Sequence, residues 1–128
     1  MPSRERVAGL IALVEQGRYV EALEQYYAGN ATMQENGHPP RAGLKALVEH
    51  ERGVMAAHKE IRTLPVERWL VDGDRVVINW VFEFTRHDGS RFRVDELTMQ
   101  RWRGDRVVEE RFYYDPAQLP SAKPASQA

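Results

Sequence analysis

Three glutamates stand where a carboxyl group could carry out acid–base chemistry. Glu35 closes a short run of strand-forming residues, 31–35, directly before the turn-rich run 36–40. Glu51 interrupts an apolar stripe at helical spacing, and Glu96 lies on an alternating strand with polar neighbours. Carboxyl groups that share apolar surroundings can share a proton, which lets one act as an acid and another as a base. We therefore take Glu35, Glu51 and Glu96 as candidate catalytic residues.

Some of these residues also have a purely structural interpretation. Glu35 could be an exposed carboxylate at a strand end, because charged residues are mostly solvated. Glu51 would reach water from the edge of its stripe after a helix rotation of about twenty degrees. His58, at the end of the same stripe, is typical of a core histidine or one that interacts with the helix dipole. His38 and His50 fall off the stripe and are expected at the surface, and the histidines show no metal-ligand spacing.

Length and composition limit the class of protein. The 128 residues carry a formal charge of −1 and include no cysteine, so disulfides and thiolate metal sites are excluded. The near-neutral charge gives no bulk attraction to nucleic acid or to a membrane. The apolar stretch 7–14 is too short for a membrane span or signal peptide, so we expect a soluble, cytoplasmic protein. We predict one domain over residues 1–115 and a flexible tail over 116–128, which is rich in Pro, Ala and Ser.

The predicted helices lie in the first half of the chain, and most of the predicted strands follow them. Apolar spacing predicts helices over 3–17, 19–28 and 42–59, and strands over 31–35 and 61–71. Three long strands follow over 75–86, 91–102 and 106–115. Asp88-Gly89 and Gly104-Asp105 separate them, which predicts an antiparallel meander. The order predicts an α+β domain in which helices pack on one side of a curved sheet and enclose a hollow for a small ligand.

Several local strings resemble the nuclear transport factor 2-like superfamily, which includes ketosteroid isomerases, SnoaL-like polyketide cyclases, scytalone dehydratase and limonene epoxide hydrolase. They are Tyr27-Ala-Gly-Asn-Ala-Thr-Met-Gln-Glu35, then Pro39-Pro40 and Gly43, and finally Gly104-Asp-Arg-Val-Val-Glu-Glu-Arg-Phe-Tyr-Tyr-Asp115. The resemblance covers about Arg4 to Asp115. It implies a cone-shaped α+β barrel, with three N-terminal helices packed on a strongly curved mixed or antiparallel sheet. It does not fix the activity, because one fold hosts many chemistries.

Individual residues follow the ketosteroid isomerase pattern only in part. Glu35 matches the catalytic carboxylate of that family, and Tyr27 matches a pocket tyrosine. The oxyanion-binding tyrosine falls on Leu10, and its protonated aspartate partner falls on Thr98. A third pocket tyrosine falls on Glu51. Because the enolate oxygen would lack its donors, steroid isomerisation is not expected.

The isomerase resemblance also assigns the two faces of the meander. The cavity face would hold Asn79, Glu83, Glu96, Thr98, Gln100, Glu110, Phe112 and Tyr114. The convex face, where this superfamily commonly forms homodimers, would hold Trp80, Phe82, Phe84, Leu97, Met99 and Tyr113. A slip of one residue at the turn 103–105 would exchange the two sets on the last strand. Phe112 and Tyr114 are equally typical of plain core aromatics.

Asp115 is the nearest counterpart of the acid–base aspartate that SnoaL-like cyclases carry near the end of the last strand. Because Pro116 follows it, Asp115 also suits a simple exit turn. Arg93-x-Asp95 with Asp115 offers the residue types of the limonene epoxide hydrolase trio. In that family, however, the Arg-x-Asp pair lies on an earlier strand, so we do not carry the trio over.

The sequence favours a small-molecule domain that is a homodimer through its sheet face. One hypothesis is an enzyme without metal or organic cofactor that acts on a small, largely apolar substrate, with Glu35 as base and Glu96 or Glu51 as its partner. The other hypothesis is a non-catalytic ligand-binding or protein-interaction domain of the same shape. The candidate substrate-binding residues are Tyr27, Asn79, Thr98, Glu110, Phe112, Tyr114 and Asp115.

Overall fold

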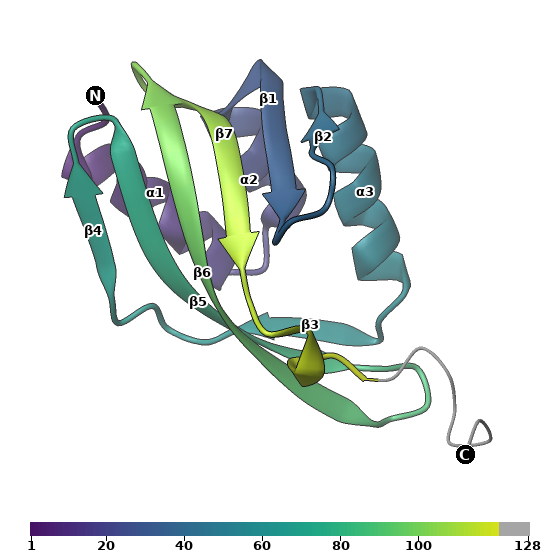
Figure 1. Ribbon diagram of the computed structural model, residues 1–128. Helices are drawn as coiled ribbons and strands as arrows, with labels where there is room; N and C mark the ends of the chain where they lie inside the picture. Colours follow the sequence, from purple (N-terminus) through teal and green to yellow (C-terminus); the bar gives the residue numbers. More distant parts are fainter. Residues whose placement is uncertain (121–128) are drawn as a thin grey trace.

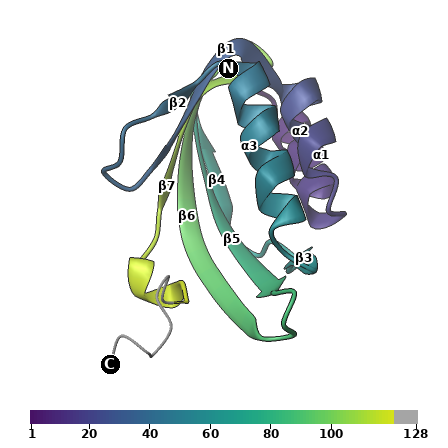
Figure 2. The same ribbon diagram turned by 90° about the vertical axis from the view of Figure 1, so that its right-hand side faces the viewer.

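The computed structural model describes residues 1–120, in which three helices pack on the concave side of one curved sheet (Figures 1 and 2). The helices are α1 (Arg4–Glu15), α2 (Tyr19–Tyr26) and α3 (Leu44–Ala56). The strands are β1 (Tyr27–Glu35), β2 (Arg41–Ala42), β3 (Glu60–Thr63), β4 (Trp69–Asp72), β5 (Arg75–Thr85), β6 (Arg91–Arg103) and β7 (Arg106–Tyr113). The predicted α+β architecture is confirmed.

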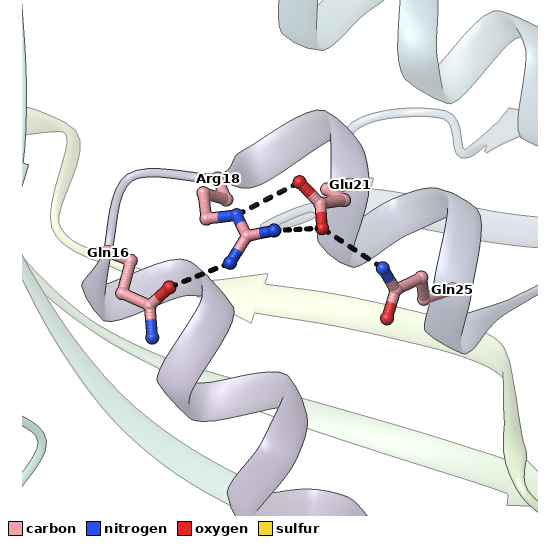
Figure 3. A network of polar contacts seen from close by, with 4 residues as sticks. All are labelled: Gln16, Arg18, Glu21 and Gln25. Carbon is pink, nitrogen blue, oxygen red and sulfur yellow. Dashed lines mark hydrogen bonds and ion pairs between the residues drawn. The ribbon is translucent and has the colours of Figure 1, made fainter.

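Local capping and a polar network set the start of the first two helices. Ser3 caps α1, since its Oγ accepts from the backbone N–H of Arg6 at 3.0 Å. At the turn into α2, Arg18 donates to Gln16 and forms an ion pair with Glu21, and Glu21 also accepts from Gln25 (Figure 3). This exposed network holds the turn that directly precedes Tyr19, the first residue of α2.

The sheet is mixed and open. Its strand order is β2-β1-β7-β6-β5-β3, with β4 paired to the other end of β5. β1 runs parallel to β7, and the remaining pairs are antiparallel. The strands curve around the helical layer but do not close into a complete barrel (Figure 2).

The predicted meander is confirmed. β5, β6 and β7 pair in sequence, and Gly89 and Gly104 have φ values of 89° and 62° at the two hairpin turns. These left-handed conformations are the reason that glycine is suited to both positions. A bulge at Val108 leaves Glu110 paired with Gln100, on the inner face of the sheet.

Several element boundaries differ from the sequence prediction, and two of the differences have a clear local cause. The expected strand 61–71 is two strands, because Pro65 has no N–H to donate and interrupts the pairing with β5. The second helix ends at Tyr26 and not at Ala28, because Tyr27 already pairs with Val107 in the sheet.

The assignment of the two faces of β5 was wrong. Trp80, Phe82 and Phe84 were expected on the convex face, but they continue the same alternation as the fully buried Val76 and Ile78. The strand turns its one consistently apolar side toward the helices because burial of that side stabilises the fold most. Asn79 and Glu83 consequently lie on the opposite, convex face.

The described part of the C-terminal segment is ordered next to the sheet. Residues Pro116–Gln118 form a 3₁₀ turn, and Gln118 exchanges hydrogen bonds with the backbone of Asp95 at 2.8 and 3.0 Å. The rest of the predicted flexible tail, residues 121–128, lies outside the described residues. No helix within residues 1–120 is both long enough and apolar enough to cross a membrane.

Candidate active site

A cavity of about 180 Å³ lies between α3 and the inner face of the sheet. It is larger than the engineered cavity of about 150 Å³ that binds benzene, so it can hold a ring-sized molecule. Its walls carry three carboxyl groups and five aromatic rings, namely Glu35, Glu51, Glu96, Tyr19, Phe82, Phe84, Phe112 and Tyr114. Arg41 and His50 provide the basic groups of the lining, and Met33, Val54 and Ile61 complete the apolar wall. We call this space the outer cavity.

A smaller hollow of about 70 Å³ adjoins the outer cavity and shares Tyr19, Met33, Glu51, Phe82 and Phe112 with it. Glu110, Tyr27, Trp80 and apolar residues of α1 and α2 line its inner part. We call this space the inner chamber. Glu51 therefore stands at the junction of the two spaces.

Glu35 accepts a hydrogen bond from a tyrosine of the opposite wall. The hydroxyl of Tyr114 donates to its Oε1 at 2.6 Å, and Nε2 of His50 lies 4.0 Å from its Oε2. The pKa of His50 is lowered, mainly because burial disfavours its charged form and the charge of Arg41 adds to this effect. The pKa of Tyr114 is raised, by burial first and then by Glu35, so Tyr114 remains a donor. This arrangement leaves Oε2 of Glu35 able to accept a proton.

Glu96 and Glu51 both hold their protons more tightly than an ordinary glutamate. Burial and the nearby carboxyl groups, chiefly Glu110 and Glu35, raise the pKa of Glu96 to about 8. The same causes raise the pKa of Glu51 to about 6. At neutral pH, Glu96 is therefore mostly a neutral acid while Glu51 is mostly a carboxylate.

Glu110 is the centre of a buried hydrogen-bond network. Tyr27 donates to its Oε1, while Gln100 and Thr98 donate to its Oε2 at 2.7 and 3.1 Å. Trp102 in turn donates to Gln100 at 2.9 Å, which fixes the orientation of the amide. Burial raises the pKa of Glu110, and the three donors counteract that effect. The network positions Glu110 and Tyr27 at the inner end of the site.

Seven of the ten predicted site residues line the outer cavity or the inner chamber, and three do not. Glu35, Glu51, Glu96, Phe112 and Tyr114 line the outer cavity, and Tyr27 and Glu110 line the inner chamber. Thr98 is fully buried and reaches the site only through Glu110.

Asn79 and Asp115 were placed wrongly. Asn79 pairs with Leu97 on the convex face and donates to Asp95 at 2.7 Å. Asp115 is exposed and caps the 3₁₀ turn by accepting from the N–H of Ala117 at 2.9 Å. For Asp115, the alternative of a simple exit turn is correct.

The sequence reasoning missed Tyr19, Arg41, His50, Phe82 and Phe84. For the two phenylalanines a signal existed, because they extend the apolar alternation that begins at Val76. For His50 and Arg41 none existed, since their distance from Glu35 depends on how α3 and β2 dock on the sheet. His58 is no cavity residue: its ring packs on Phe84 and its Nδ1 lies 2.8 Å from the carbonyl oxygen of Val54. Within residues 1–120, no group of three or more suitable side chains could hold a metal ion.

The family pattern of SnoaL-like domains matches residues 7–110, which is most of the chain. The protein belongs to the SnoaL-like domain family. A candidate SnoaL-like polyketide cyclase from Mesorhizobium loti is 27% identical, with a TM-score of 0.78 over 89% of this chain and 100% of that one. The fold of this SnoaL-like domain is thus the cone-type nuclear transport factor 2-like fold, as the resemblance implied.

Two more distant structures share only the fold with this SnoaL-like domain. IdmH, a candidate polyketide cyclase from Streptomyces antibioticus, is 23% identical with a TM-score of 0.72 over 90% of this chain and 93% of its own. A ketosteroid isomerase-like protein from Catenulispora acidiphila, solved with trimethylamine, is 19% identical with a TM-score of 0.77 over 91% of this chain and 90% of its own. The curated proteins gave no match.

Proposed function

We propose that this SnoaL-like domain transfers protons on a small, largely apolar molecule that has a carbonyl group. The observation that carries the proposal is that Glu35, Glu51 and Glu96 come from three different elements and line one cavity. The pKa of Glu96, about 8, also lies above that of Glu51, about 6. Groups whose environments separate their pKa values are suited to act as acid and base in one reaction.

Glu35 is the proposed base and Glu96 the proposed acid. Glu35 removes a proton from the carbon next to the carbonyl group, and the electrons of the broken C–H bond move to form the enol. Glu96 donates its proton to the carbonyl oxygen, which supplies the donor that Leu10 and Thr98 cannot supply at the isomerase positions. Return of a proton to another carbon of the enol completes an isomerisation. In a ring closure of the aldol type, the enol carbon instead attacks a second carbonyl carbon of the same molecule, and the oxygen of that carbonyl takes up the proton held by Glu35. Glu51 contributes to the raised pKa of Glu96.

Deuterium exchange tests this proposal without knowledge of the natural substrate. The protein in D₂O should speed the exchange of the α-hydrogens of cyclohexanone or 2-tetralone, followed by proton NMR. Glu35→Gln should slow exchange by about a hundred-fold or more, because general bases contribute on that scale. Exchange should also decline above about pH 8, since Glu96 then loses its proton.

Glu49→Gln is the matched control, because Glu49 is an exposed residue of α3 outside both spaces. It should exchange as fast as the wild type. If exchange in the presence of the protein equalled the rate in buffer while the ketones still bound measurably, the proposed enzyme activity would be contradicted. The protein would then be a non-catalytic binding domain.

We also propose a homodimer that forms through the convex face of the sheet. Apolar residues there form a stripe in which the exposed Leu70 and Met99 flank the half-buried Val77, next to the exposed pair Leu97 and Tyr113. Leu70 is 69% exposed and Leu97 50% exposed, and adjoining apolar residues of this kind mark association surfaces.

The dimer proposal predicts a measurable change in mass. Light scattering should give twice the chain mass of 14.8 kDa for the wild type. The double variant Leu97→Glu with Met99→Glu should run as a monomer, because each protomer would have to desolvate two carboxylates in the interface. A wild type that stays monomeric at high concentration would contradict the dimer.

A further inference from the structure

We infer that the inner chamber is a binding subsite for an ammonium group, either a protonated amine or a methylated ammonium. The natural ligand would then be a small molecule with a cationic head in the inner chamber and a less polar body in the outer cavity. This inference deepens the proposed function and rests on it only in treating the outer cavity as the place where that body reacts.

The wall of the inner chamber has the composition that attracts an organic cation. Five aromatic residues line it, namely Tyr19, Tyr27, Trp80, Phe82 and Phe112. Glu51 and Glu110 are the acidic residues of the same lining, and no lysine, arginine or histidine of the described chain is among its residues. Aromatic rings attract a cation through the negative faces of their π systems, and more strongly when the cation is desolvated.

Glu51 lacks a partner within the described chain, whereas Glu110 has three donors. Burial and the charges of Glu110 and Glu35 determine the state of Glu51, and no hydrogen bond contributes. A mostly buried carboxylate without a donor is costly, and a proton or a bound cation relieves that cost. A cation in the inner chamber would supply the missing opposite charge.

The size of the inner chamber limits the group that enters. Its volume of about 70 Å³ suits one compact group and not a ring system, whereas the outer cavity of about 180 Å³ can hold a ring. Arg41 and His50 lie in the outer cavity and not in the inner chamber. An anionic head would therefore find its basic partners in the outer cavity, next to Glu35.

A matched set of probes tests the charge preference directly. Phenyltrimethylammonium carries the cation, tert-butylbenzene is its neutral isostere of the same shape, and benzoate is the anionic probe. Binding is measured by protein-detected NMR titration at about pH 7.5, where Glu51 is ionised because its pKa is about 6. The cation should bind about ten-fold more tightly than the isostere, which is the scale of a desolvated cation–π and ion-pair contact. The shifted signals should include Trp80 and Tyr27.

Glu51→Gln keeps the shape of the side chain and removes its charge. This variant should lose most of the preference for the cation while it still binds the neutral isostere, which shows that the cavity is intact. Glu49→Gln, on the exposed side of the same helix, should keep the full preference. Equal binding of cation and isostere by the wild type would overturn the inference, and so would tighter benzoate binding or an unchanged preference in Glu51→Gln.

The binding test and the exchange test fail independently. A cation preference without deuterium exchange would leave the ammonium subsite in place and remove the proposed proton transfer. Exchange of the neutral ketones without any cation preference would support the proposed proton transfer and contradict the ammonium subsite.

Discussion

Replacement of Glu110 by alanine is expected to lower the free energy of unfolding by about 3 kcal/mol or more, as loss of one member of a buried polar network typically does. Glu110 is 3% exposed and accepts from Tyr27, Gln100 and Thr98. Its removal takes away the main acceptor of three buried donors. Only the longer contacts of Thr98 with the carbonyl oxygen of Arg111 at 3.3 Å and of Gln100 with the hydroxyl of Tyr27 at 3.5 Å remain, and each unsatisfied buried group costs about 1–3 kcal/mol.

Urea unfolding followed by circular dichroism measures this change. Glu109→Ala is the matched control because Glu109 is the preceding residue on the same strand but faces solvent, where it pairs with Arg101. An exposed ion pair of this kind contributes about 0–1 kcal/mol. If Glu110→Ala and Glu109→Ala had similar unfolding midpoints, the network would have no structural importance.

The protein is expected to lose stability as the pH rises from about 5 to about 8.5. The unfolded-state pKa of a glutamate is near 4.5, whereas the folded-state values of Glu51 and Glu96 are about 6 and about 8. Between these limits Glu51 and Glu96 bind more protons in the folded protein than in the unfolded chain, so their deprotonation favours unfolding; the lowered pKa of His50 acts in the opposite direction below about pH 6.5. The stabilisation is complete below pH 4.5 and is lost as the pH passes through 6 and then 8. Its upper limit is about 7 kcal/mol, since one pKa unit corresponds to about 1.4 kcal/mol.

Urea unfolding across this pH range, with single variants, assigns the effect to residues. Glu96→Gln should remove most of the loss between pH 6 and 8, and Glu51→Gln should remove the part at lower pH. Glu83→Gln, which changes a surface carboxyl paired with Arg93, should retain the full pH dependence. A stability that rises with pH in the wild type would show that these carboxyl groups are stabilised as anions.

The order of helices and strands could be predicted from the sequence, because the local signals for helices and turns agree with one another. The glycines at 89 and 104 mark the hairpins, and the apolar spacing marks the helices. The broken strand at Pro65 was also legible in principle, since proline cannot donate to a ladder. The α1–α2 turn and the docking of β2 depend on contacts between distant residues, and no local pattern predicts them.

The site residues were predicted best on β6, where polar residues occupy the face of the strand that is turned toward the core. Glu96, Thr98 and Gln100 are polar residues of β6 that face inward, while the apolar Leu97 and Met99 of the same strand face outward. Such a conflict is expected at a functional site, where a local rule is broken and other contacts compensate. The isomerase resemblance placed polar residues of β5 on the cavity face as well, and there it was wrong, because β5 buries its apolar side.

We propose that the cavity holds Glu96 as a neutral acid beside Glu51, which ionises at a lower pH. Carbon-13 NMR of the side-chain carboxyl carbons, titrated from acid to alkaline pH and assigned with Glu96→Gln and Glu51→Gln, measures each pKa directly. We expect a midpoint near 8 for Glu96 and near 6 for Glu51. Midpoints near the ordinary glutamate value of about 4.5 for both residues would contradict the account.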